Sequence, residues 1–337
     1  MAWQSFVTLR SLREGTMGLI YIMICLLLND EVHSSFEVKK FLNRFPWETA
    51  IHNCNKSGDN LTFAVPRVEL CSLKVLEKLD LKGDAWVGYF QTYEYFMFIA
   101  CVPLSEIERS VSEKFKLVKC ENRPGLCYSV CGLRGYIGLL DDVCYCIVQS
   151  TFPTLDLKSV NTSCEDPLHC VNNEMLCGNR EYNKVSVYNN VSISSNDIKG
   201  VGSGCLVVTK GSRYEISVAN CSDRFQHLCE SVTDPNLYLE ESPMNDQWVY
   251  SFRDCPKTGK KPITFVGDST KFVFPDTNGS WWTSVVRDLV IRNYSKSMII
   301  NETPVYQGFL TNSAEGTKLD FIYARNNLRM TSVACMS

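Results

Sequence analysis

The chain has 337 residues, of which 45% are hydrophobic and 21% charged, and its formal net charge is −3. This composition is typical of globular protein and excludes wholesale disorder, while the length favours two or three domains. The near-neutral charge, without a long basic run, argues against nucleic acid as a partner.

An apolar run extends from Met17 to Leu28. It is shorter than the roughly 20 residues that a membrane-spanning helix needs, and it matches the core of a secretory signal peptide. We therefore expect a signal peptide over residues 1–35, a secreted extracellular protein, and no membrane span after its removal. Two alternatives stay open: an uncleaved signal anchor, and a shorter chain that starts at Met17.

Cysteine usage and sequons point to the same compartment. Removing Cys25 with the signal peptide reduces the 17 cysteines to an even number, as a disulfide-bonded secreted protein should have. The predicted disulfide cysteines are Cys54, Cys71, Cys101, Cys120, Cys127, Cys131, Cys144, Cys146, Cys164, Cys170, Cys177, Cys205, Cys221, Cys229, Cys255 and Cys335. The Asn-x-Ser/Thr sequons predict N-glycosylation at Asn55, Asn60, Asn161, Asn190, Asn220, Asn278, Asn293 and Asn301.

The first part of the mature chain is predicted to combine helices and strands. Trp47, Ala50 and Cys54 have helical spacing, and an extended run follows at 60–65. A second amphipathic helix is expected over 68–82, because apolar residues recur there and Gly83 suits a helix C-terminus. An aromatic strand is then expected from Trp86 through residue 98.

A cysteine-rich run occupies the middle of the chain. We expect the side chains of Cys144 and Cys146 to leave a strand on opposite faces, and therefore to take different partners. The order Cys127-x3-Cys131, then Gly-Tyr-Ile-Gly-Leu, then Cys144-Tyr-Cys146, then Cys-Gly before Val-Tyr resembles the WSC domain over Lys119–Tyr188. The resemblance implies a small, multiply disulfide-bonded extracellular module, in residues 116–191, linked to carbohydrate binding.

The segments on either side of this module resemble the two halves of a C-type-lectin-like domain. The helix with Trp47 and Cys54, followed by Trp86-Val-Gly, resembles its opening over Phe36–Leu104, and a Phe-x3-Cys229-Glu strand in Gly204–Glu230 resembles its end. We therefore expect one lectin-like domain, formed by residues 36–115 and 196–231, with the WSC-like module inserted. A row of separate small modules is the alternative.

The insertion scheme implies a disulfide pattern. Its bonds are Cys54–Cys229, Cys205–Cys221, Cys71–Cys101 and Cys255–Cys335, with the eight cysteines from Cys120 to Cys177 paired among themselves.

Residues 232–337 are expected to form a β-rich C-terminal region, with strands at 248–252, 263–266, 271–274, 285–291 and 319–323. The predicted fold class is thus α+β. It combines disulfide-rich extracellular modules, a lectin-like α/β scaffold with the inserted WSC-like module, and this C-terminal region.

Catalytic patterns do not appear in the sequence. There is no His-Glu-x-x-His, P-loop or Gly-x-Ser-x-Gly motif, so we expect no enzyme, no cofactor and no metal site. The run from Gly200 to Gly204 predicts a β-turn and not a phosphate-binding loop. The Glu-Pro-Asn and Trp-Asn-Asp calcium motifs of lectins are absent too, so any lectin activity is expected to be calcium-independent.

Sugar rings stack on aromatic side chains, and polar groups fix their hydroxyls. The candidate ligand-binding residues are Tyr136, Tyr145, Asp141, Asp142, Trp281 and Trp282. Core packing is the alternative use of the aromatic residues, and a solvated turn that of the two aspartates. We expect a secreted, non-catalytic recognition protein that binds extracellular carbohydrate or glycoprotein. The alternative is a protein-binding or structural ectodomain, as in a soluble receptor form, with no sugar site.

Overall fold

The computed structural model is built mainly of β-strands. It describes residues 36–47, 49–50, 54, 62–63, 68–70, 72–76, 79, 81–117, 122–132, 135–148, 175–193, 198–211, 214–231, 240–241, 245–257, 260–263, 279–293, 305–314, 316–324 and 330–336. Five disulfides join cysteines within these ranges. The protein is therefore rich in disulfides and in β-strands, which confirms this part of the predicted fold class. None of the described helices is long and apolar enough to cross a membrane.

Strand β5 (Ala85–Pro103) organises the whole molecule. It has 19 residues, far more than a usual strand of about 3–10, and β-branched and aromatic residues fill it. Its first part pairs with β17 (Tyr306–Ser313), its middle with β16 (Ser280–Asn293), and its end with β9 (Lys184–Val191). The strand predicted from Trp86 through residue 98 is confirmed.

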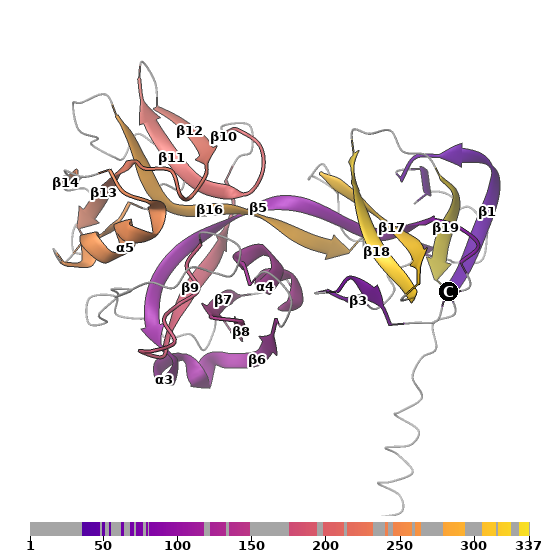
Figure 1. Cartoon of the computed structure of the whole chain (residues 1–337), viewed down its shortest axis with the longest axis horizontal. Helices are drawn as coiled ribbons and strands as arrows, with labels where there is room; N and C mark the ends of the chain where they lie inside the picture. The colour runs from indigo at the N-terminus through magenta and orange to yellow at the C-terminus, as the bar shows by residue number, and fades with distance from the viewer. Residues whose placement is uncertain are drawn as a thin grey trace, which may run out of the picture.

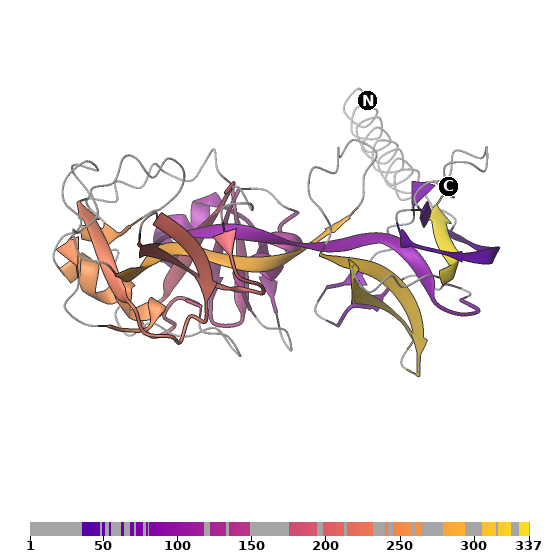
Figure 2. The same cartoon turned by 90° about the horizontal axis from the view of Figure 1, so that it is seen from above.

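Strands β5 and β16 run antiparallel through the middle of the molecule and connect two lobes (Figure 1, Figure 2). We call the paired segments, 89–97 of β5 and 285–293 of β16, the waist. The terminal lobe lies at one end and holds the described strands within 36–75 and 306–336. The inner lobe lies at the other end and holds the described elements within 104–262.

The terminal lobe brings the two ends of the described chain together. Its strands are β1 (Phe36–Phe45), β2 (Thr62–Phe63), β3 (Val68–Glu69), β4 (Lys74–Val75), β17, β18 (Gly316–Tyr323) and β19 (Met330–Met336). β19 pairs antiparallel with both β1 and β2. The Cys54–Cys335 disulfide locks this arrangement. The predicted bonds Cys54–Cys229 and Cys255–Cys335 are therefore wrong.

Helical residues around Trp47 and Cys54 are confirmed where they are described. Trp47, Ala50 and Cys54 are buried together against Trp86 and Phe90. The Trp47 indole N–H donates to the Val87 carbonyl at 2.8 Å. The helix is thereby fixed to β5, and the extended run predicted at 60–65 appears as β2.

The helix predicted over 68–82 does not form in the part of that range that the structure describes. The described residues there are β3, a turn and β4, and Leu73 in the turn has a φ of 54°. The Leu319 N–H donates to the Leu73 carbonyl, and Val75 is buried against Leu310 and Leu319. Pairing with β18 thus overrides the apolar periodicity, and it leaves Leu76 61% exposed.

The first part of the inner lobe is a small sheet covered by a helix. It contains α3 (Leu104–Ile107), η1 (Glu108–Ser110), β6 (Val111–Lys116), α4 (Pro124–Val130), β7 (Tyr136–Leu140), β8 (Val143–Ile147) and β9. The strands lie in the order β6, β8, β7, β9, and β9 continues onto β5.

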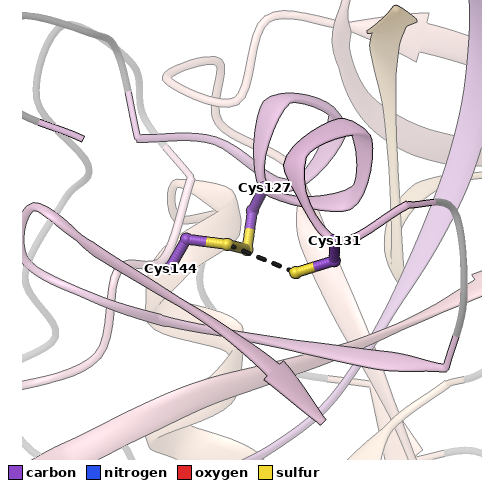
Figure 3. A group of neighbouring side chains, drawn as sticks. All are labelled: Cys127, Cys131 and Cys144. Atoms are coloured by element: carbon purple, nitrogen blue, oxygen red, sulfur yellow. Dashed lines mark hydrogen bonds between the residues drawn. A yellow bond between two sulfur atoms is a disulfide. The ribbon is translucent and has the colours of Figure 1, made fainter. Parts of the chain in front are cut away.

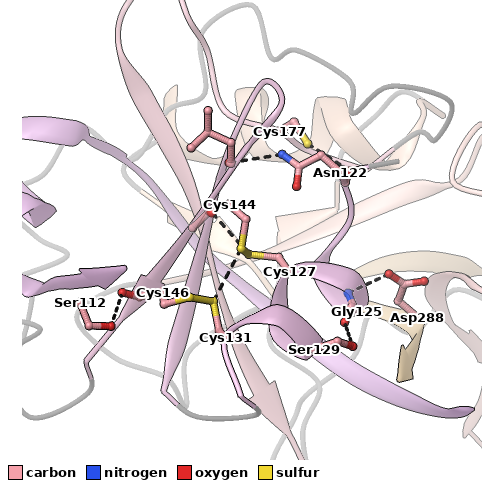
Figure 4. Close-up of a disulfide and its surroundings, with 12 residues drawn as sticks. Ser112, Asn122, Gly125, Cys127, Ser129, Cys131, Cys144, Cys146, Cys177 and Asp288 are labelled. Carbon is pink, nitrogen blue, oxygen red and sulfur yellow. Dashed lines mark hydrogen bonds between the residues drawn. A yellow bond between two sulfur atoms is a disulfide. The ribbon is translucent and has the colours of Figure 1, made fainter. Parts of the chain in front are cut away.

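Two neighbouring disulfides fasten α4 to β8. Cys127 pairs with Cys144, and Cys131 pairs with Cys146 (Figure 4). The expectation that Cys144 and Cys146 point to opposite faces is wrong, because residues two apart in a strand share a face. Both reach cysteines one helical turn apart on α4, and the prediction of different partners holds.

The second part of the inner lobe surrounds the far end of β16. It contains β10 (Ile198–Lys199), β11 (Gly204–Lys210), β12 (Tyr214–Ala219), β13 (Gln226–Ser231), β14 (Glu240–Glu241), α5 (Trp248–Lys257) and β15 (Lys260–Pro262). β16 lies between β11 and β13, and the predicted Cys205–Cys221 bond is confirmed.

The strand predicted at 248–252 is instead the start of α5. Its buried residues Trp248, Ser251 and Cys255 have the spacing of one helical face. Cys255 bonds to Cys229 on β13, and the Trp248 indole donates to the Thr283 carbonyl at 2.7 Å. Strands are confirmed at 285–291 and 319–323, 263–266 is described only at its first residue, and 271–274 lies outside the described residues.

Candidate functional site

The two tryptophans proposed as sugar contacts lie in the core. Trp281 and Trp282 on β16 are 0% and 1% exposed. The Trp282 indole donates to the Asp246 carbonyl at 2.8 Å, and its ring packs edge-on against Phe225. Neither ring offers an open face for a ligand, so their role is packing.

Tyr136 and Tyr145 lie on one face of the β7–β8 hairpin, since Tyr145 is paired with Gly138, two residues from Tyr136. Tyr136 is half-buried, whereas Tyr145 is buried. Burial raises the pKa of the Tyr145 phenol, and the nearby Glu108 and Asp142 raise it further. The apolar side chains around both rings make them part of a packed cluster.

Asp141 and Asp142 form the tip of the same hairpin. The Arg180 guanidinium lies 3.0 Å from Asp141, and the Lys116 ammonium lies 3.5 Å from Asp142. Arg180 and Lys116 are largely exposed, so these pairs make a solvated turn. The structure thus does not bring the six predicted ligand-binding residues into one site.

The cysteine cluster at α4 and β8 has the spacing of a metal site but is fully oxidised. Figure 3 shows the three sulfurs of Cys127, Cys131 and Cys144 within one small volume. Each belongs to a disulfide and is not a thiolate, which a metal would need. The same holds for Cys229 and Cys255 beside the buried His227. Cys101 and Cys177 are disulfide-bonded as well, and the predicted Cys71–Cys101 bond lies outside the described residues.

A group of tyrosines that the sequence analysis did not single out lies beside the waist. Tyr306 pairs with Gln91 of β5 on one side and with Tyr323 of β18 on the other. Gln91 and Tyr93 share a strand face, so the rings of Tyr93, Tyr306 and Tyr323 lie on one side of the sheet. The centroids of Tyr306 and Tyr323 are 5.6 Å apart. We call these three residues the tyrosine platform.

The platform is accessible and held by its own contacts. Tyr93 and Tyr306 are half-buried, and Tyr323 is 37% exposed. Burial raises the pKa of the Tyr93 phenol to about 12, and the charge and hydrogen bond of Tyr306 act in the same direction. The Tyr93 phenol is therefore neutral at physiological pH and can donate a hydrogen bond.

Arg287 of β16 lies beside the platform on the same face of the sheet. Its guanidinium carbon lies 4.7 Å from the centroid of the Tyr93 ring. Its Nε and Nη2 donate to the carbonyls of Gly202 and Gly200 at 2.8 and 3.2 Å. These glycines have φ values of +87° and +97°, which suit the turn predicted there. Val201 between them is 92% exposed, so Arg287 links the platform to a protruding apolar turn.

Two ion pairs lie on the opposite face of the waist. Glu94 and Asp288 lie directly opposite each other there, which would be unfavourable without counter-charges. Arg292 Nε donates to Glu94 at 2.6 Å, and Arg123 Nη1 lies 3.3 Å from Asp288. Asp288 also accepts the Gly125 N–H at 2.8 Å, which ties α4 to β16 (Figure 4).

The described sequons differ in their surroundings. Asn220 is exposed, and its side-chain oxygen accepts from Ser222. Asn190 on β9 is half-buried, and its amide nitrogen donates to Glu94 at 2.7 Å. Asn293 is exposed at the end of β16. Asn55, Asn60, Asn161, Asn278 and Asn301 lie outside the described residues.

A sequence signal for the platform does exist in β5. Half-buried Tyr89, Gln91 and Tyr93 alternate with buried Phe90 and Thr92, so the tyrosines follow one strand face. This alternation does not reveal Tyr306 and Tyr323, because only the pairing of β17 with β5 and β18 brings them to that face.

Comparison of the chain with protein-family models, with curated protein sequences and with solved structures finds no match.

Proposed function

We propose that this protein is a secreted, non-catalytic recognition protein that binds extracellular carbohydrate or glycoprotein at the tyrosine platform. The accessible tyrosine rings on one face of the sheet, next to a fixed arginine, are the observation that carries the proposal. The disulfides fit a protein that folds in an oxidising compartment.

The chemistry of the platform suits a sugar. The apolar faces of pyranose rings stack on aromatic rings, and neutral phenols hydrogen-bond to sugar hydroxyls. A stacked ring adds about 0.5–1.5 kcal/mol beyond the burial of apolar area, and each hydrogen bond a similar net amount. A few such contacts correspond to dissociation constants of roughly millimolar to micromolar per site. Calcium is not needed for any of them.

The resemblances to known modules support the same proposal. In it, residues 119–188 are a WSC-like module, and the terminal lobe is lectin-like. A first-helix cysteine bonded to the closing strand is the feature expected of a lectin-like domain, and Cys54 bonds to Cys335 on β19. We therefore propose that β19 closes the lectin-like lobe, in the place that Gly204–Glu230 was expected to take.

The test is binding to a glycan array, followed by titration of the positive glycans with and without a calcium chelator. We expect chelator-resistant binding that Tyr306→Ala and Tyr323→Ala each weaken by about two- to tenfold, the value of one aromatic contact. Tyr182→Ala is the matched control, because Tyr182 is 48% exposed and lies outside the platform. A chelator effect, or equal losses in the control, would contradict the proposal.

A protein ligand is the second candidate, and Val201 favours it. A valine that is 92% exposed on a turn held by Arg287 is an apolar knob of the kind that a protein pocket can take. If the natural ligand is a protein, Val201→Asp should abolish its binding, whereas Tyr323→Ala should have little effect. The reverse result favours the carbohydrate.

A further inference from the structure

We infer that the tyrosine platform selects an acidic saccharide, one that carries a carboxylate or a sulfate, and that Arg287 supplies the selectivity. The inference rests on the proposed function, because it concerns the ligand of the same platform. It goes further by assigning a charge to that ligand.

Arg287 is a buried cation without a carboxylate partner among the residues that the structure describes. Arg287 is only 6% exposed, and among the described residues its side chain contacts two backbone carbonyls and the Tyr93 ring. Carbonyl oxygens and a ring face accept hydrogen bonds and attract a cation, but they carry no net charge. A buried charge of this kind is costly unless an opposite charge approaches it.

Two other arginines, one in the waist and one at the start of α4, show the contrast. Arg123 is paired with the buried Asp288, and Arg292 with the buried Glu94. Arg287 lies on the other face of the waist from these two ion pairs, so neither carboxylate neutralises it. Asp288 neighbours Arg287 in sequence, but consecutive residues of a strand point to opposite faces, and its carboxylate is held by Arg123, Ser203 and Gly125.

The positive charge of Arg287 lies directly beside the platform. Arg287 covers one side of the Tyr93 ring, and Tyr93 is hydrogen-bonded to Tyr306 of the platform. A guanidinium has five N–H donors, and two of them are used by Gly200 and Gly202. The remaining donors form the planar fork that binds carboxylate or sulfate oxygens. A sugar stacked on Tyr306 or Tyr323 could place an acidic substituent against this fork.

Carboxylate and sulfate share this chemistry, and the probes separate them. The experiment titrates the intact protein with immobilised hyaluronan, which is carboxylated, with heparin, which is sulfated, and with neutral dextran. We expect at least one acidic polymer to bind about tenfold or more tightly than dextran, which is the value of one charge-assisted hydrogen bond. Binding to it should weaken as salt is raised.

Two substitutions locate the charge. Arg287→Gln should lower the ratio of acidic-polymer to dextran binding at least tenfold, toward one, and Arg287→Lys should retain part of that ratio. Arg180→Gln is the matched control, because Arg180 is an exposed arginine outside the platform and should matter little. Disulfide mapping and thermal unfolding show whether the variants are folded. If Arg287→Gln does not fold, the ratio of acidic-polymer to dextran binding by the wild-type protein still tests the inference.

The outcomes distinguish the two proposals. Equal binding of acidic and neutral polymers would overturn the inference and leave the proposed function standing. An acidic preference lost equally in Arg180→Gln would show diffuse surface attraction, and it would also overturn the inference. Binding of no glycan at all would remove the proposed function and the inference together.

Discussion

Cys54 and Cys335 are bonded to each other across 281 residues of chain, with their Cα atoms 5.7 Å apart. The bond joins the helical segment beside β1 to the last described strand, and β1 and β19 are paired along the same edge. The terminal lobe is therefore assembled from both ends of the described chain, and β5 and β16 connect it through the waist to the inner lobe.

This closure can be tested by removing the bond. Cys54→Ser together with Cys335→Ser should lower the free energy of unfolding by about 2–5 kcal/mol, because a bridge over a long loop restricts the unfolded chain strongly. Urea unfolding measures the loss. In the wild type, peptide mapping should recover Cys54 linked to Cys335, and a Cys54–Cys229 peptide would contradict the structure.

The paired disulfides of α4 and β8 predict a specific failure in a single mutant. Cys131 Sγ lies 3.6 Å from Cys144 Sγ, although the two are not bonded to each other. Cys146→Ser frees the Cys131 thiol, whose thiolate can attack Cys144, form a Cys131–Cys144 bond and release the Cys127 thiolate. We expect this exchanged bond in non-reducing mass spectrometry, along with poor secretion.

The double variant is the control for that exchange. Cys131→Ser with Cys146→Ser has no free thiol at the site, so it should keep Cys127–Cys144 and be secreted better than the single variant. Equal behaviour of the two variants would show that exchange plays no part. Normal secretion and protease resistance of Cys146→Ser would show that its disulfide is dispensable.

Occupancy of two sequons should differ. Asn220 is exposed, with its amide oxygen and not its nitrogen held by the turn, so a glycan can be carried there. Asn190 donates its amide nitrogen to Glu94, so a glycan on it would disturb the Glu94–Arg292 pair. Glycopeptide mass spectrometry of the secreted protein should find Asn220 occupied and Asn190 bare. A fully occupied Asn190 would contradict the contact.

The close approach of α4 to β16 makes Gly125 sensitive to substitution. A Cβ at Gly125 would collide with the Leu289 carbonyl and lie 2.9 Å from Asp288 Oδ2. Gly125→Ala should therefore destabilise the protein by about 1–3 kcal/mol or more, as overpacking does. Gly132→Ala is the control, because nothing lies within 4 Å of a Cβ there, although its φ of +68° costs about 1 kcal/mol. Similar melting temperatures of Gly125→Ala and Gly132→Ala would argue against the close packing of α4 on β16.

Alkaline titration probes the platform directly. The Tyr93 pKa is raised to about 12, above the value of about 10 for an exposed phenol. The protonated form is therefore favoured by folding, and its contribution to stability is complete below pH of about 10 and lost as the pH rises through 12. Difference absorbance should show a late-ionising phenolate that Tyr93→Phe removes. An unchanged number of late-ionising tyrosines in Tyr93→Phe would contradict the buried contact with Tyr306.

The sequence by itself determined the local features of this protein. Cys205 and Cys221 are separated by 16 residues, and their bond needs only the β11–β12 hairpin between them. The strands around Trp86 and Val285 follow from aromatic and β-branched residues, which fit a pleated sheet in almost any context. That the protein is rich in disulfides follows from its cysteine content alone.

Tertiary structure decided which apolar surfaces meet. Periodicity at 68–82 shows that one side is apolar, but β18 selects a hairpin over a helix there, and at 248–252 the partners Cys229 and Thr283 select the helix. Trp281 and Trp282 are as aromatic as Tyr306 and Tyr323, yet β16 is an inner strand and β18 lies near the edge. Local sequence sets the chemistry of a side chain, whereas its exposure depends on neighbours that lie hundreds of residues away.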